Sequence, residues 1–131
     1  MKIVQNNKNE VLRMLDQATD SALWAIGAEM EANAKTYETR VHTGRLRNSI
    51  TFATHRNQGE TYSYTDNDGN MYTDKIGLGA RKDRVYVGTN VEYAPVHELG
   101  YRKISALHFL QRSVSDHVDR YKAILEASLK E

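Results

Sequence analysis

Cysteine is absent from this chain of 131 residues, and proline and tryptophan each occur only once. Without cysteine the chain has no disulfide framework and no thiolate metal site, which is compatible with a reducing compartment. The sequence also lacks an apolar run of membrane-spanning length, and its first residues lack the apolar core of a signal peptide. These absences predict a soluble protein, made in a cytoplasm and without a membrane partner. The length predicts a single domain, residues 1–131.

Charge of one sign is also lacking. The chain has 18 basic and 17 acidic side chains and a net charge of +1, so its overall charge does not mark a binder of nucleic acid or membranes. Its hydrophobic fraction, 40%, is slightly low for a compact domain of this length. We interpret the shortfall as residues left for extended loops or for burial against neighbouring molecules.

The apolar residues of segment 9–37 recur every three or four positions, which predicts one long amphipathic helix. Asn9 is its expected N-cap. Trp24 lies off the main stripe, and Gly27 costs a helix about 1 kcal/mol relative to alanine, so we expect a second, closely packed contact face. The stripe consists of Val11, Leu15, Ala18, Ala22, Ile26, Met30, Ala34 and Tyr37.

Strand-like runs dominate the middle of the chain. Residues such as threonine, tyrosine, valine and isoleucine alternate with polar residues, and an aspartate-glycine pair at 68–69 predicts a hairpin. The expected strands cover residues 50–54, 61–65, 71–76 and 84–88.

Two more helices are predicted after the strands. A short helix from Ala94 to Leu99 has Pro95 in its first turn, Gly100 at its C-terminal end and Asn90 as its expected cap. A long helix from about 105 to 129 carries the last apolar stripe. The stripe consists of Leu110, Val114, Val118, Tyr121, Leu125 and Leu129. The element order predicts an α+β fold, in which long N-terminal and C-terminal helices pack on a small antiparallel sheet with an extended hairpin.

Motifs for metal binding and catalysis fail on spacing. A calcium loop starting at Asp66 needs glycine sixth and glutamate twelfth, but Met71 and Gly77 occupy these positions. The pair His97-Glu98 resembles the start of a zinc-protease helix, but Tyr101 stands where the second histidine is needed.

The glycine-rich segment 77–82 ends in Lys-Asp and precedes a strand, whereas a phosphate loop ends in Lys-Ser or Lys-Thr and precedes a helix. No nucleophile elbow or acid–base pair emerges. We therefore expect no catalytic residue, no metal and no cofactor.

A basic stretch runs from Arg40 to Arg56, with Arg45 and Arg47 between them and no acidic residue. Arginine's planar fork suits phosphate, so a small nucleic-acid-binding module is the alternative function. The favoured interpretation is that some of these arginines pair with acids elsewhere, such as Glu98 or Glu92, because the chain has no net basic excess.

Tyrosines outnumber phenylalanines by eight to two. Such rings are often half exposed, with the hydroxyl reaching solvent or a partner. Tyr62, Tyr64 and Tyr72 lie on the expected hairpin with little apolar backing, and we interpret them as contacts for a protein partner.

Three segments in this order resemble one family, the neck and tail-completion proteins of long-tailed bacteriophages. The family has a threonine-glycine-arginine-leucine turn after a long helix, a valine-glycine-threonine segment leading to tyrosine-alanine-proline and a glutamate before glycine, and a phenylalanine-leucine pair opening the last helix. The matching residues are Thr43, Gly44, Arg45 and Leu46; Val87, Gly88, Thr89, Tyr93, Ala94, Pro95, Glu98 and Gly100; and Phe109 and Leu110.

The match covers most of the chain, with two departures. The family often has a proline-rich lead into its phenylalanine-leucine pair, whereas this chain has residues 104–108, which contain no proline. Segment 59–82 is also longer than the plain family core, which is consistent with an added hairpin.

The resemblance implies a structural virion protein, made in the host cytoplasm, that helps to connect the DNA-filled head to the tail. Relatives form rings around the DNA passage, either as a neck ring under the head or as a terminator ring on the tail. The implied partners are further copies of the chain, phage connector and tail proteins, and DNA in the lumen, bound without sequence preference.

The resemblance also suggests a role for single residues. Arg45 is expected to be an internal anchor that bonds to Glu98, while Arg47 or Arg56 faces the lumen. The expected structural anchors are Thr43, Gly44, Arg45, Tyr93, Pro95, Glu98 and Gly100.

Overall fold

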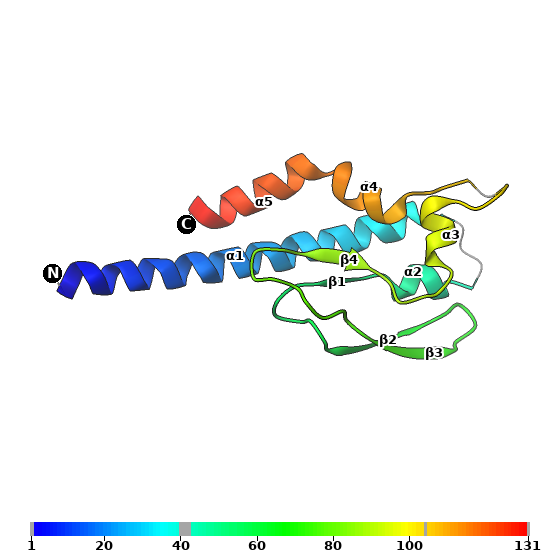
Figure 1. Cartoon of the computed structure of the whole chain (residues 1–131), viewed down its shortest axis with the longest axis horizontal. Helices are drawn as coiled ribbons and strands as arrows, with labels where there is room; N and C mark the ends of the chain where they lie inside the picture. Colours follow the sequence, from blue (N-terminus) through cyan, green and yellow to red (C-terminus); the bar gives the residue numbers. More distant parts are fainter. Residues whose placement is uncertain (1, 40–42, 104, 131) are drawn as a thin grey trace.

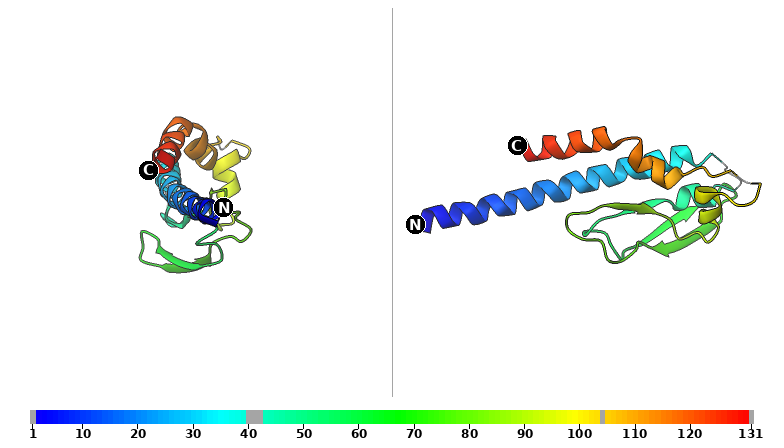
Figure 2. Two further views of the ribbon diagram at one scale, coloured as in Figure 1. Left: turned by 90° about the vertical axis from the view of Figure 1, so that its left-hand side faces the viewer. Right: turned by 45° about the horizontal axis from the view of Figure 1, so that its top comes forward.

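One long helix, α1 (Lys2–Tyr37), runs the length of the molecule in this computed structural model (Figure 1). The structure describes residues 2–39, 43–103 and 105–130, and their side chains from residue 17 onward. Two C-terminal helices, α4 (Phe109–Ser115) and α5 (Val118–Lys130), fold back along one side of α1. The first turns of α1 extend beyond all other elements (Figures 1 and 2). None of the helices in these ranges combines the length and apolar character that crossing a membrane requires.

The strands form two antiparallel pairs. The strands β1 (Thr51–Ala53) and β4 (Tyr86–Gly88) pair beside α1, whereas β2 (Thr61–Thr65) and β3 (Met71–Lys75) form a hairpin that is the outermost layer (Figure 2). Two short helices complete the fold: α2 (Arg45–Ser49) precedes β1, and α3 (Ala94–Leu99) follows β4. The predicted α+β architecture is confirmed, although its sheet consists of two separate pairs.

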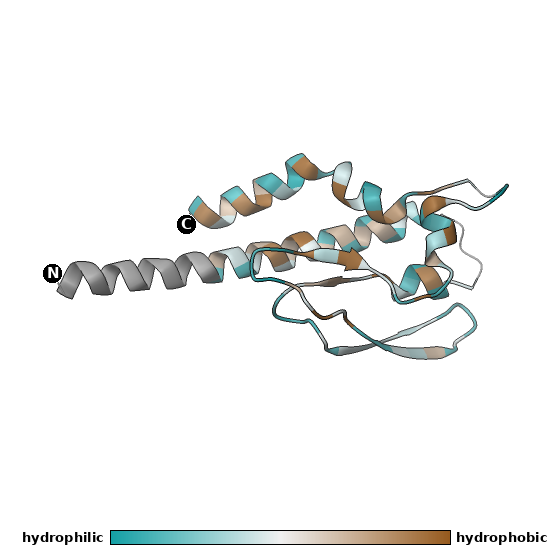
Figure 3. Cartoon of the chain, in the orientation of Figure 1, coloured by the Kyte–Doolittle hydropathy of each residue, from teal (hydrophilic) through white to brown (hydrophobic). Residues whose placement is uncertain are grey.

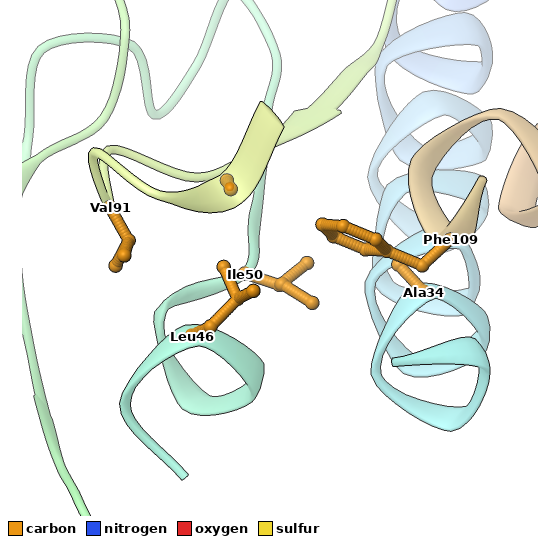
Figure 4. Packing of buried hydrophobic residues seen from close by; sticks show 6 residues of the cluster. Ala34, Leu46, Ile50, Val91 and Phe109 are labelled. Carbon is orange, nitrogen blue, oxygen red and sulfur yellow. The ribbon is translucent and has the colours of Figure 1, made fainter. Parts of the chain in front are cut away.

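The main core lies at the C-terminal end of α1, where α2, α3 and α4 meet. Phe109 is fully buried beside Ala34, and Ile50 points toward both from the end of α2 (Figure 4). The small alanine side chain allows the phenyl ring to approach the α1 backbone closely, as dense interior packing requires. The buried members of this cluster are Ala34, Leu46, Ile50, Val91, Ala94 and Phe109.

A second, smaller cluster forms farther along α1, where Ile26 and Met30 pack against Tyr121 of α5. Four residues of the predicted α1 stripe, Ala22, Ile26, Met30 and Ala34, are confirmed as core. Apolar residues mark the helices and β4 in Figure 3, whereas most of the hairpin is pale or hydrophilic.

The expected second face of α1 is also present. A Cβ atom on Gly27 would lie 2.4 Å from Cδ2 of Phe52, so only glycine allows β1 to approach this closely. The Trp24 ring meets the Phe52 ring edge-on, with 4.9 Å between the centroids.

Two predicted helix starts are wrong. Because α1 begins at Lys2, Asn9 lies inside the helix and is not its N-cap. The side chains of Val11 and Leu15 lie outside the described part. At α3 the N-cap position belongs to Tyr93, and the Asn90 amide instead donates to the Lys75 carbonyl at 2.8 Å.

The prediction of a single final helix is wrong as well. It is divided by a turn at 116–117, and α4 begins at Phe109 because His108 has a left-handed backbone, with φ of 50°. The turn shifts the face of the apolar stripe, so Val114 and Val118 are exposed while Phe109, Ser113 and Tyr121 are buried.

Candidate functional site

The three segments that carry the family resemblance meet in one corner of the molecule, which we call the motif corner. It consists of the main core cluster and the polar residues that bond around it. Leu46 comes from the first segment, Val91 and Ala94 from the second, and Phe109 from the third. The first segment lies more than forty residues before the other two, and all three share one core (Figure 4).

The turn at Thr43 and Gly44 joins α2 to the tip of the hairpin. The Thr43 carbonyl accepts the Asn67 N–H, and the Thr43 hydroxyl accepts the Arg45 N–H at 3.3 Å. Gly44 has φ of +82°, and a Cβ there would lie 2.6 Å from the Asn67 side-chain oxygen. Both the backbone conformation and the available space therefore require glycine. Gly44, and not Thr43, occupies the N-cap position of α2.

Arg45 links three segments of the chain. Its Nη1 lies 3.2 Å from Glu92 Oε1, and its guanidinium carbon lies 4.7 Å from the centre of the Tyr72 ring. The same carbon lies 6.0 Å from the Tyr93 ring. A hydrogen bond within Glu92 and the charge of Arg45 lower the pKa of the Glu92 carboxyl. The acid that Arg45 contacts is thus Glu92, and the role of Arg45 as a structural anchor stays a prediction.

Glu98 has a different role from the expected pairing with Arg45. Its carboxylate accepts the backbone N–H groups of Leu110 at 2.9 Å and Gln111 at 3.1 Å. These are donors of the first turn of α4 that have no partner within the helix, so Glu98 holds the start of α4 against α3. The expected pairing of Glu98 with Arg45 is therefore wrong. A cap that joins two separate segments leaves no local spacing signal in the sequence.

The remaining motif residues shape α3. Pro95 occupies its first turn, where a missing N–H costs nothing, and Gly100 ends it with φ of 80°. The Tyr93 ring lies 5.8 Å from the His97 ring. His97 Nδ1 lies 2.9 Å from a carboxylate oxygen of Glu38, which is almost completely buried just after α1. This contact ties α3 to the end of the long helix.

The hairpin tyrosines form a stack on the face that points toward α2. Tyr62 and Tyr64 have ring centroids 5.7 Å apart, and Tyr64 and Tyr72 are 5.4 Å apart. The hydroxyls donate within the chain, Tyr62 to the Ser49 carbonyl and Tyr64 to Asp74, both at 2.8 Å. The third, Tyr72, donates to Asp66 at 3.2 Å.

The expectation of exposed rings is therefore wrong for Tyr64, which is only 8% exposed, and Tyr62 and Tyr72 are half-buried. Their use as partner contacts stays a prediction. Burial, the larger cause, and the hydrogen bond to Asp74 raise the pKa of Tyr64 to about 12. Burial, again the larger cause, and the charge of Asp74 raise the pKa of Tyr62.

The aspartate-rich segment forms the hairpin turn that the sequence predicts. Asp66 Oδ1 accepts the N–H groups of Asp68 and Asn70, both at 2.9 Å. Burial opposes ionisation of Asp66, but the hydrogen bonds to its carboxylate outweigh this effect and lower its pKa. In the described ranges no group of three or more histidine, aspartate or glutamate side chains is arranged to hold a metal ion.

The basic stretch is divided by the fold. Arg40 lies outside the described residues, and Arg45 is engaged at the motif corner. Arg47 is half-buried in α2, whereas Arg56 is exposed in the loop after β1, with its guanidinium carbon 5.1 Å from the centre of the Trp24 ring. The candidate DNA-facing residues, Arg47 and Arg56, therefore lie at opposite ends of β1 and do not form one patch.

Sequence reasoning missed two polar contacts of the corner: the pair Glu38–His97, and a hydrogen bond between the hydroxyls of Ser49 and Thr89. Each joins residues at least forty positions apart. Thr89 belongs to the motif segment, which is the only signal that pointed toward it.

Comparison of the chain with known protein families, curated proteins and solved structures finds no match.

Proposed function

We propose that this chain is a structural virion protein of a long-tailed bacteriophage or prophage. It acts without catalysis at the head–tail connection, in neck assembly or tail completion, by forming a ring of identical copies around the DNA passage. Its partners are other copies of itself and phage connector and tail proteins.

The observation that carries this proposal is the convergence of the three motif segments. Segments that resembled the family separately in the sequence are neighbours in space, with Leu46, Ala94 and Phe109 in one core. Around that core Arg45 pairs with Glu92, and Glu98 caps α4. These contacts account for the motif residues as shape-holding parts, which is what a repeated assembly unit needs.

The surface supports self-association. Both sheets have only two strands, and an exposed strand edge can pair with a strand from another chain. Leu78 and Leu99 are large apolar side chains that are mostly exposed.

DNA in the lumen would be contacted through phosphates, without sequence preference. Arg56 is the better placed of the two predicted DNA-facing residues because it is exposed, whereas Arg47 is half-buried. The alternative function, a nucleic-acid-binding module based on residues 40–56, is weakened because Arg45 is already paired with Glu92.

Size-exclusion chromatography with light scattering, together with electron microscopy, tests the proposal. The chain is measured alone and mixed with connector and tail proteins encoded by neighbouring genes. We expect rings, either from the chain alone or on addition of a partner. A chain that stays monomeric with every partner contradicts the proposal.

The alternative is tested by binding of duplex DNA at several salt concentrations. A phosphate-binding module loses affinity steeply as salt rises, and charge reversal at Arg45 and Arg47 should abolish that slope. If DNA binding changes neither with salt concentration nor with the charge reversals, the nucleic-acid-binding function is excluded.

A further inference from the structure

One loop presents an apolar side chain at the end of the β-layer. Leu78 is 84% exposed, the highest value among the large hydrophobic residues in the described ranges. The loop is nevertheless held in place, because the N–H groups of Gly79 and Ala80 both donate to Gln58 Oε1, at 3.0 and 2.9 Å. We call residues 77–84 the Leu78 loop.

The rest of the Leu78 loop is basic. Arg81, Lys82 and Arg84 are exposed, with a single acid, Asp83, among them. The loop thus combines one projecting apolar side chain with an excess of positive charge.

A groove of complementary character lies beside α3. Its volume is about 400 Å³, within the range of pockets that hold small molecules, so a leucine side chain and adjacent backbone fit. Glu92 and Glu98 are its charged lining residues, and no basic side chain of the described residues lines it. Its apolar lining consists of Val91, Ala94, Pro95, Leu99 and Leu110. We call it the α3 groove.

The loop and the groove of one copy cannot meet. The Leu78 loop lies at the end of the β-layer nearer the chain's N-terminus, and α3 lies at the opposite end (Figures 1 and 2). Two different surfaces at opposite ends of a molecule give a head-to-tail contact, and such a contact generates a ring when its rotation closes.

We propose that the Leu78 loop of one copy docks in the α3 groove of the next copy. This inference rests on the proposed function, since it assigns the two surfaces through which the ring is built. Leu78 enters the apolar groove, and the loop's basic residues lie near Glu92, whose side chain is 73% exposed although both of its oxygens accept from Arg45. Opposite charges on the two surfaces set the orientation and favour encounter.

The absence of cysteine allows a direct test. The variants Leu78→Cys and Leu99→Cys are mixed and treated with a short thiol-reactive cross-linker, because Leu99 is 69% exposed beside the groove. We expect cross-linked pairs of the two variants, and a ladder of multimers from the double variant. The control replaces Leu99→Cys by Met71→Cys, a residue 73% exposed on the hairpin, and should give only background cross-linking.

A second variant measures the contribution of the apolar contact. Leu78→Asp should weaken self-association roughly tenfold or more, whereas Met71→Asp should leave it within about twofold. Circular dichroism checks that both variants are folded, and if Leu78→Asp is not, the cross-linking result decides.

The outcomes separate this inference from the function on which it rests. If the wild-type chain forms rings but Leu78→Asp does so equally well, or both cross-linking pairs react alike, the interface is wrong and the proposed function stands. If the wild-type chain forms no assembly alone or with phage partners, both are wrong. Salt-sensitive DNA binding without cross-linking assigns the basic loop to nucleic acid and also overturns the interface.

Discussion

The motif corner and the β2–β3 hairpin are built by different physical means. The corner is an apolar core in which Phe109 and Ile50 are almost completely buried. The hairpin has its tyrosines stacked beside Arg45, with hydroxyls bonded to carboxylates and a carbonyl. Burial of apolar area is indifferent to pH, whereas a stack with hydroxyl–carboxylate bonds is not. We therefore expect the corner to determine the stability of the fold and the hairpin to respond to conditions.

The largest loss of stability should come from removing a buried side chain of the motif corner. Phe109→Ala removes a fully buried ring and leaves a cavity, which should lower the free energy of unfolding by about 3–5 kcal/mol. Chemical denaturation measures it. The control Leu129→Ala removes a side chain that is 44% exposed and should cost less than about 0.5 kcal/mol. Equal effects of the two variants would contradict the account of the corner.

The joint between corner and hairpin comes next. Gly44→Ala places a side chain at positive φ, which costs about 1–2 kcal/mol, and forces its Cβ against Asn67. Gly69→Ala is a matched control, because Gly69 has φ of +86° with nothing within 4 Å of its Cβ position. Thermal denaturation should show a larger loss for Gly44→Ala. If the two losses are the same, the contact with Asn67 does not hold the hairpin tip.

A smaller effect is the pH dependence of stability, which distinguishes the hairpin from the motif corner. Folding raises the pKa of Tyr64 from 10.0 to about 12, so its contribution is complete below pH 10 and is lost as the pH rises toward about 12. The denaturation midpoint of the wild-type chain should fall across this window, and Tyr64→Phe should make the fall shallower. Tyr101→Phe, at a residue 56% exposed, should leave the pH profile unchanged. If Tyr64→Phe does not alter the pH profile, the Tyr64–Asp74 hydrogen bond does not cause the loss of stability at high pH.

The smallest effect concerns the cation between the two regions. Arg45→Lys keeps the charge but loses the planar fork toward Glu92 and the contact with the Tyr72 ring. The lost ring contact alone should cost about 0.5–1 kcal/mol in chemical denaturation. Arg56→Lys, whose guanidinium lies over the exposed Trp24, serves as the comparison. A larger loss for Arg56→Lys would show that Arg45 is not the anchor.

Local sequence signals predicted much of the hairpin and of α3. The boundaries of β2 and α3 agree with the structure because tyrosine-threonine alternation, Pro95 and Gly100 each mark a short element locally. The break between α4 and α5 was missed because the apolar period continues across residues 116–117 without a glycine or proline.

Long-range partners were harder to predict. The sequence suggested Glu98 as the acid for Arg45, but Glu98 accepts from the first turn of α4 and Glu92 pairs with Arg45 instead. The burial of Tyr64 depends on α2 covering the inner face of the hairpin, and no spacing within the hairpin indicates that cover.

Native mass spectrometry of the full chain, alone and with the connector and tail proteins that the proposed function names as partners, addresses the central proposal most directly. Assembly by docking one end of each copy onto the other predicts a single closed stoichiometry that does not grow as protein concentration is raised. A monomer under all of these conditions, or a continuous series of open-ended chains, would contradict it.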